Sequence, residues 1–491
     1  MPSLNSIEAP IKYRIEIYPF ADPNRTETII LINTITDEFD IPSGATDASD
    51  FYYLESFSFQ NDIFNPIQSG SARVVQTQYD KIDFFQKVAE GDLLFIKEND
   101  DNIFCGYIES LQYDISVSGT NITVNFVNFI KQLSKAKVFG LIFENIQPAQ
   151  GVVMQYFLDD ITNNTLIALA KEKSGLFSFQ LYQGEGEDPS LVLKNDTRAF
   201  LTITSFMNIL QAINKVLYPY QRLIYQDSLG NIVIAPLSLF DDLKWIFQQQ
   251  NNSVGDLNII PYLNFSIKKN AAGVPNYEYA TLFTIPSAQG ALSGNQSQQN
   301  SAWFCQYTPP EDEAFNRINQ LYNSAFFTIA DVIIEDIIVD PNKIDATLNN
   351  IAELIQGSTT SKSANVTITS VNKTPSSQIP IQSEGQNKVD VSAILFNYAA
   401  RTMAENLVEE TQVSITSMRI KQTDENGDLL PLPINRLIDV DFDDGILPNG
   451  SLFCRGYVFT YSANGGALVT LNCTKPLVGG AYWVNGGLVS V

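Results

Sequence analysis

The sequence predicts a mainly β protein with an α+β middle, in which two similar antiparallel β-barrel domains flank mixed αβ domains. Three observations support this fold class. Short segments that alternate apolar and polar residues dominate both ends of the chain. One motif occurs near each end, as Phe-Cys-Gly-Tyr-Ile at 104–108 and as Phe-Cys-Arg-Gly-Tyr-Val at 453–458. Helical spacing of apolar residues is found in the middle of the chain and just before the second motif.

The repeated motif has the same neighbourhood in both places. A short β-like stretch precedes each copy, and a polar turn with another alternating strand follows it. Because order and context repeat together, we interpret the motif as the mark of a duplicated β unit, although chance recurrence is the alternative. We expect residues 10–140 and 410–475 to form similar barrels. The residues that mark the repeat are Phe104, Gly106, Tyr107, Phe453, Gly456 and Tyr457.

Five regions follow along the chain. Residues 1–145 are expected to form the first β-barrel domain, and residues 146–255 a mixed αβ domain. Residues 256–390 should form a second middle domain with polar loops. A helix and the second β-barrel are expected at 391–476, followed by a Gly-rich tail at 477–491.

The two middle domains contain the more specific expectations. Apolar spacing predicts a helix at 205–218, with Thr204-Ser205 as its N-cap and Pro219 after its end. A β-hairpin at 222–235 follows, with a Gly-Asn turn. The Ser-, Thr-, Gln- and Asn-rich stretch at 356–390 is expected to be a surface excursion or a domain connection.

Composition excludes several kinds of function. The 491 residues carry a formal charge of −24, and so acidic a surface repels phosphate and disfavours specific nucleic-acid binding. The chain has no histidine, which removes Ser-His-Asp and Cys-His catalysis and imidazole-based zinc sites. No apolar run is long enough to cross a bilayer, and the N-terminus has no secretory signal. The Cys105 and Cys454 thiols are expected to be buried and free.

Carboxylates are the remaining candidates for chemistry, and their arrangement argues against it. The acidic doublets are adjacent residues at 159–160, 241–242 and 443–444, and neighbours on one strand point to opposite faces. Glycosidases instead need two carboxylates that converge across a cleft. We therefore expect no enzyme, no catalytic residues, no cofactor-binding residues and no metal ligands.

The order of elements resembles that of the baseplate hub proteins of long-tailed, contractile-tailed phages and of phage-like injection machines. The resemblance rests on residues 90–96 followed by 103–110 in the first half. In the second half it rests on residues 435–442, 452–461 and 468–476, and on the helix that precedes them. It extends over most of the chain as an order of elements, but its motifs are short.

This resemblance implies a structural hub, a homotrimeric ring with pseudo-six-fold symmetry that joins the hexameric tail tube to the trimeric central spike. The implied partners are the tube protein above, the spike protein below and other baseplate proteins, with a lumen through which DNA can pass. The implied location is the virion tail baseplate, after assembly in the host bacterial cytoplasm. Two alternatives remain open: another tail structural or receptor-binding β protein, and a carboxylate-only wall-degrading enzyme.

Overall fold

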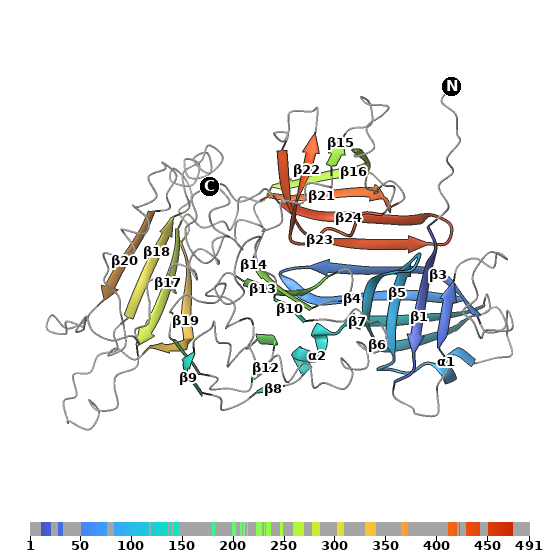
Figure 1. Cartoon of the computed structure of the whole chain (residues 1–491), viewed down its shortest axis with the longest axis horizontal. Coiled ribbons are helices and arrows are strands. Elements are labelled where there is room, and N and C mark those ends of the chain that lie inside the picture. The colour runs from blue at the N-terminus through green and yellow to red at the C-terminus, as the bar shows by residue number, and fades with distance from the viewer. Residues whose placement is uncertain are drawn as a thin grey trace.

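The computed structural model in Figure 1 describes one part near each end of the sequence and several elements between these two parts. It describes residues 11–135 with gaps at 21–27, 33–50, 76–82 and 117–118, and residues 411–474 with gaps at 420–421, 423–428 and 442–449. Between 137 and 371 it describes the strands given below and a few residues beside them. The predicted helix before the second barrel and the predicted tail at 477–491 lie outside the described residues.

Seven strands from the first part of the chain close into a barrel. Their order is β2-β1-β5-β6-β7-β4-β3, and a parallel pairing of β2 with β3 completes the ring. The other neighbours in the ring are antiparallel. The strands are β1 (Tyr13–Tyr18), β2 (Ile29–Ile32), β3 (Phe51–Asp62), β4 (Asn65–Val75), β5 (Leu93–Glu98), β6 (Asp101–Ser116) and β7 (Gly119–Asn128), and two short helices, α1 (Asp83–Lys87) and α2 (Ile130–Lys135), accompany them.

Six further strands close a second barrel, in the order β23-β22-β15-β16-β21-β24 with β24 paired back to β23. The short strand β15 is parallel to both of its neighbours, and the other pairs are antiparallel. The strands are β15 (Ile246–Gln248), β16 (Ile259–Lys269), β21 (Thr411–Met418), β22 (Arg436–Asp441), β23 (Gly450–Ser462) and β24 (Gly466–Thr474). The mainly β fold class is therefore confirmed.

The second barrel takes β15 and β16 from a part of the chain that the sequence analysis divided between the two middle domains. Hydrophobic periodicity can locate a strand such as β16, but it cannot say which sheet that strand joins. Pairing decides this, and β16 pairs with β21 across more than a hundred intervening residues. The residues between these two strands contribute four of the six strands of a separate sheet.

The remaining strands form three small sheets. β8 (Lys137–Val138) pairs with β12 (Met207–Asn208), and a three-stranded sheet has the order β10-β14-β13. A six-stranded sheet has the order β20-β18-β17-β19-β11-β9 and lies to one side of the barrels in Figure 1. The strands of the last two sheets are β9 (Ile142–Ile146), β10 (Phe179–Leu181), β11 (Ala199–Thr202), β13 (Arg222–Gln226), β14 (Ile232–Pro236), β17 (Tyr277–Thr284), β18 (Ala302–Thr308), β19 (Ile329–Val339) and β20 (Asn365–Val371).

Three features of this middle region bear on the sequence expectations. The predicted hairpin is confirmed, because β13 pairs with β14 in antiparallel register. Strand β20 lies inside the polar stretch that was expected to be an excursion, and it pairs with β18. The described middle is made mostly of strands, so the expected mixed αβ character is not confirmed. In the described part of the chain, no helix has the length and apolar character needed to span a membrane.

The predicted start of the helix at 205–218 is wrong. Met207 and Asn208 are in strand β12, so the helix cannot begin at Thr204-Ser205. Gln211 N–H donates to Asn208 Oδ1 at 2.8 Å, and Asn208 N–H donates to Gln211 Oε1 at 3.2 Å. This reciprocal pair is a capping box, which makes Asn208 the N-cap of the helical residues that follow.

One antiparallel ladder joins the two barrels into a continuous sheet. Strand β3 of the first barrel pairs with β23 of the second, from Ser56 opposite Ser462 to Asp62 opposite Gly456. Figure 1 shows β23 and β24 lying directly beside β3 and β4. Gly456 is required in this ladder, because a Cβ atom there would lie 2.0 Å from the Asn61 carbonyl oxygen.

We expect Gly456→Ala to lower the free energy of unfolding by about 1–3 kcal/mol, since the backbone of β3 would have to move away from the new methyl group. Urea unfolding followed by circular dichroism measures the change. Gly465→Ala is the matched control, because its nearest neighbour is the movable Ser462 hydroxyl group. An equal loss in both variants would contradict the role assigned to the ladder.

Candidate functional site at the junction of the two barrels

The two copies of the repeated motif occupy comparable strands. Phe104, Gly106 and Tyr107 lie on β6, which pairs with β5 and β7. Phe453, Gly456 and Tyr457 lie on β23, which pairs with β22 and β24. Each motif strand is therefore the centre of three consecutive antiparallel strands. Superposition of Tyr107 on Tyr457 remains a prediction of the duplication.

Aromatic side chains bring the two motifs together inside the fused sheet. The ring of Phe59 on β3 has its centroid 5.3 Å from that of Phe104 and 6.1 Å from that of Tyr457. Phe59 also stacks on Phe459, and Phe57 stacks on Phe459 with an interplanar angle of 2°. All of these rings are buried. The aromatic cluster therefore connects the cores of the two barrels across the ladder.

The tip of the β13–β14 hairpin is packed against this junction. The fully buried side chain of Gln226 donates from Nε2 to the Cys105 carbonyl at 2.7 Å, and its Oε1 accepts from Phe129 N–H at 3.1 Å. Its own carbonyl accepts from Asn61 Nδ2 at 3.0 Å and from Gln68 Nε2 at 2.6 Å. Four hydrogen bonds thus fix one glutamine between the first motif and the ladder.

The packing of the hairpin also explains why Gly230 lies at its turn. Gly230 has a φ of +87°, which a residue with a side chain rarely adopts. A Cβ atom at this position would lie 2.6 Å from the Sγ of Cys105. The Cys105 and Cys454 side chains are buried and neither forms a disulfide, which confirms the expectation from the sequence. Burial raises the pKa of the Cys105 thiol, so it remains protonated.

A buried ion pair connects the barrels at a second place. Arg419, just after β21, donates from Nε and Nη2 to the two carboxylate oxygens of Glu98 on β5, at 2.9 and 2.8 Å. Both side chains are almost fully buried. Tyr13 O–H donates to Glu98 Oε1 at 2.8 Å, and Arg419 Nη1 donates to the Gln422 side chain at 3.2 Å. Gln422 Nε2 in turn donates to Ser417 Oγ.

This ion pair fixes the orientation of one barrel relative to the other, since its geometry is bidentate and its charges are shielded from water. Burial and the neighbouring Glu98 raise the pKa of Tyr13, which therefore stays a hydrogen-bond donor. The Tyr13 ring also lies 4.7 Å from that of Tyr461 on β23. Burial raises the pKa of Tyr461 to about 12.

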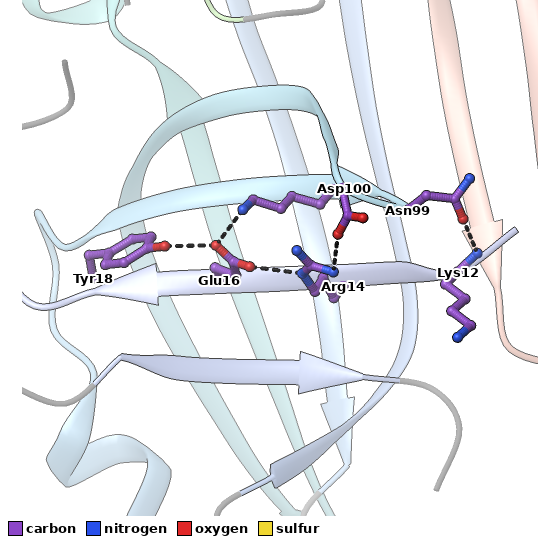
Figure 2. A network of polar contacts seen from close by, with 7 residues as sticks. Lys12, Arg14, Glu16, Tyr18, Asn99 and Asp100 are labelled. Atoms are coloured by element: carbon purple, nitrogen blue, oxygen red, sulfur yellow. Dashed lines mark hydrogen bonds and ion pairs between the residues drawn. The ribbon is translucent and has the colours of Figure 1, made fainter. Parts of the chain in front are cut away.

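A third polar network covers the outer face of β1 and β5, as Figure 2 shows. Glu16 accepts from Arg14 Nε at 2.8 Å and from Tyr18 O–H at 2.7 Å, and Lys97 Nζ lies 2.9 Å from its Oε2. Arg14 also reaches Asp100 at 3.2 Å. Burial alone would raise the pKa of Glu16, but the hydrogen bonds from Tyr18, Lys97 and Arg14 outweigh it and lower that pKa.

The described geometry of the junction is suited to holding the two barrels rigidly. Within the residues that the structure describes, no group of three His, Cys, Asp or Glu side chains could hold a metal ion. The acidic doublets at 159–160, 241–242 and 443–444 lie outside those residues. Sequence reasoning found both motif strands but missed Gln226, Glu98 and Arg419, each of which has a partner 85 to 321 residues away in the chain.

Solved structures provide the comparison with known proteins. The tail protein from Neisseria meningitidis MC58 aligns with a TM-score of 0.53 and 10% identity, over 97% of this chain and 99% of that one. The 43 kDa tail protein of prophage MuSo2 from Shewanella oneidensis aligns with a TM-score of 0.51 and 10% identity, over 86% of this chain and 94% of that one.

The chain has the fold of these tail proteins. The alignments extend over most of each chain. At 10% identity, the likeness establishes the fold alone. The sequence matches no protein-family model and no curated protein.

We expect Arg419→Met to destabilise the protein by about 3–5 kcal/mol, because it leaves the Glu98 carboxylate buried without its cation. The double variant Glu98→Leu with Arg419→Met should be more stable than this single variant, since no uncompensated charge remains. Urea midpoints of the wild type, both single variants and the double variant form the cycle. Strictly additive losses would show that the two side chains are not coupled.

The polar network on β1 predicts a stability change in acid. Because the pKa of Glu16 is lowered on folding from its ordinary 4.5, its contribution is complete above that value and is lost as the pH falls through the folded-state pKa. Glu16→Gln should therefore show a weaker loss of stability than the wild type between about pH 5 and pH 2. Urea midpoints across this range test it, and parallel curves for both proteins would contradict the assignment.

Proposed function

We propose that this chain is a structural baseplate hub of a phage tail or of a phage-like injection machine. In this proposal it forms a homotrimeric ring with pseudo-six-fold symmetry, which joins the hexameric tail tube to the trimeric central spike. The tube protein lies above the ring, the spike protein lies below it, and other baseplate proteins contact its outside. The proposed location is the tail baseplate of the virion, after assembly in the host cytoplasm.

The observation that carries the proposal is the fusion of two closed barrels in one chain through the β3–β23 ladder. Three such chains present six barrels in a ring, which matches the six subunits of a tube layer. The same three chains have true three-fold symmetry, which matches a trimeric spike. The shared fold with two tail proteins from bacterial genomes supports this assignment.

The composition supports the same role. With a charge of −24, a ring of these chains would repel the phosphates of DNA, so nucleic acid could pass through its lumen without binding specifically. A hub acts through shape and stable contacts and needs no catalytic residues, cofactor or metal. The buried, hydrogen-bonded junction supports a body that transmits force between tube and spike without internal movement.

The expected state of the purified protein is a trimer with three times the 54.6 kDa mass of one chain. Stable interfaces of this kind bury more than about 1,000 Å² each, so the trimer should survive dilution. Light scattering measures the mass, and electron microscopy of the assembly should show six barrels in one ring. A monomer at every concentration, or a two-fold dimer in the native particle, would contradict the hub assignment.

A further inference from the structure

Two cysteines of the second barrel lie directly opposite each other on neighbouring strands. Cys454 on β23 is paired with Cys473 on β24 in the antiparallel register of these strands. Their side chains are 0% and 3% exposed, and both belong to the buried core of the barrels. Residues opposite each other on antiparallel strands project to the same face of the sheet, so the two thiols enter the same part of this core.

The two thiols also contact each other. Cys473 shares a side-chain hydrogen bond with Cys454. The Cys454 thiol has two carbonyl acceptors of its own, that of Pro433 at 3.5 Å and that of Gly456 at 3.4 Å from its Sγ. Since the hydrogen of Cys454 is directed to these carbonyls, the lone pairs of its sulfur are left to accept from Cys473. Each sulfur is therefore a direct neighbour of the other.

This arrangement meets the main geometric requirement for a disulfide bond. Opposite residues on antiparallel strands have Cα atoms about 4.5 or 5.5 Å apart, depending on whether the pair is hydrogen-bonded. Disulfides join cysteines whose Cα atoms are about 4.4–6.8 Å apart. Both kinds of pair fall within this range, so the two sulfurs can be joined with little movement of the strands.

The other cysteines have different residues opposite them. Cys105 in the first motif lies opposite Phe95 on β5. Cys305 lies opposite Ala280 on β17 and Ile368 on β20. Within the strands that the structure describes, one pair of cysteines is therefore in register, and it is the pair in the second barrel.

We propose that Cys454 and Cys473 are the site of a reversible cross-strand disulfide, formed by exchange with a small-molecule disulfide such as oxidised glutathione. This inference goes beyond the proposed hub role and does not depend on it. One cysteine thiolate attacks the small disulfide, which gives a mixed disulfide and releases one thiolate. The second cysteine thiolate then attacks the protein sulfur of the mixed disulfide, which forms the Sγ–Sγ bond and releases a second thiolate.

The exchange balances without any other reactant. The two protons that the cysteines lose are taken up by the two released thiolates. The protein is oxidised by two electrons, and one molecule of the small disulfide is reduced by two electrons to two thiols. An excess of the small thiol runs the same steps in reverse, so the site is reversible.

Burial keeps the pair reduced while the barrel stays closed. Burial and the hydrogen bond with Cys454 raise the pKa of Cys473 well above its usual range. Because the thiolate is the attacking species, exchange is slow in the closed barrel. Local opening of β24 admits the small disulfide, and re-pairing of the strands then brings the two sulfurs together.

The bond would lie at the place where the second barrel closes. The pairing of β24 back to β23 completes the ring of six strands. Strand β23 also forms the ladder with β3. A covalent link between β23 and β24 therefore opposes opening of the barrel beside that ladder, and it also restricts the unfolded chain.

Peptide mapping of the full-length protein tests the proposal. Reduced protein is incubated with oxidised glutathione, both in buffer and in urea below the unfolding midpoint, where local opening gives the reagent access. Remaining thiols are alkylated before digestion without reductant. We expect a peptide with Cys454 linked to one with Cys473, two hydrogens lighter than their sum. The oxidised protein should have a higher urea midpoint than the reduced protein.

Two variants separate this pair from the other cysteines. Cys473→Ala should give no internal disulfide, whereas Cys105→Ala should still give the link. If the wild type forms no link in either incubation, or forms one that includes Cys105 or Cys305, the proposal is wrong. A link that lowers the urea midpoint would also overturn it, because the native barrel would then not accommodate the bond.

Discussion

The ladder between β3 and β23 is the interaction on which the rest of the described structure depends. It turns two closed barrels into one sheet, and it requires backbones so close that only glycine fits at position 456. Phe57, Phe59 and Phe459 pack into one aromatic cluster because the ladder brings their strands together. Without this pairing the barrels would be two separate bodies with separate cores.

Two sets of buried polar contacts then fix the orientation of the two barrels at the junction. Gln226 fills a position between the first motif and the ladder and satisfies buried amide and carbonyl groups from both. Arg419 and Glu98 form a bidentate pair away from water. Replacing a buried polar pair by apolar side chains is often neutral, whereas removing one partner is costly, so such groups tolerate one geometry and penalise others. Orientation, rather than stability, is what these groups provide.

The sequence was informative where structure is local and much less so where it depends on distant pairing. Alternation and turn residues identified most strands, and the related motifs at 104–108 and 453–458 indicated two barrels. The membership of β16 in the second barrel could not be predicted, because any strand of that pattern fits either sheet. Arg419 and Gln226 read as ordinary polar residues, since burial comes from segments elsewhere in the chain. At the helix start, Thr204-Ser205 and Asn208 are equally good caps by composition, and only the strand at 207–208 distinguishes them.

The order of the strands along the chain also has a consequence for synthesis. Strand β3 is complete once Asp62 has been made, but its partner strand includes Gly456, which is made 394 residues later. At typical rates of synthesis of about 5–20 residues per second, the interval is roughly 20–80 s. During that time the first barrel can close while one flank of β3 stays without its final neighbour, in a cell where other copies are being made. An unpaired strand edge can pair with another copy of the chain, and the charge of −24 opposes such contact between copies.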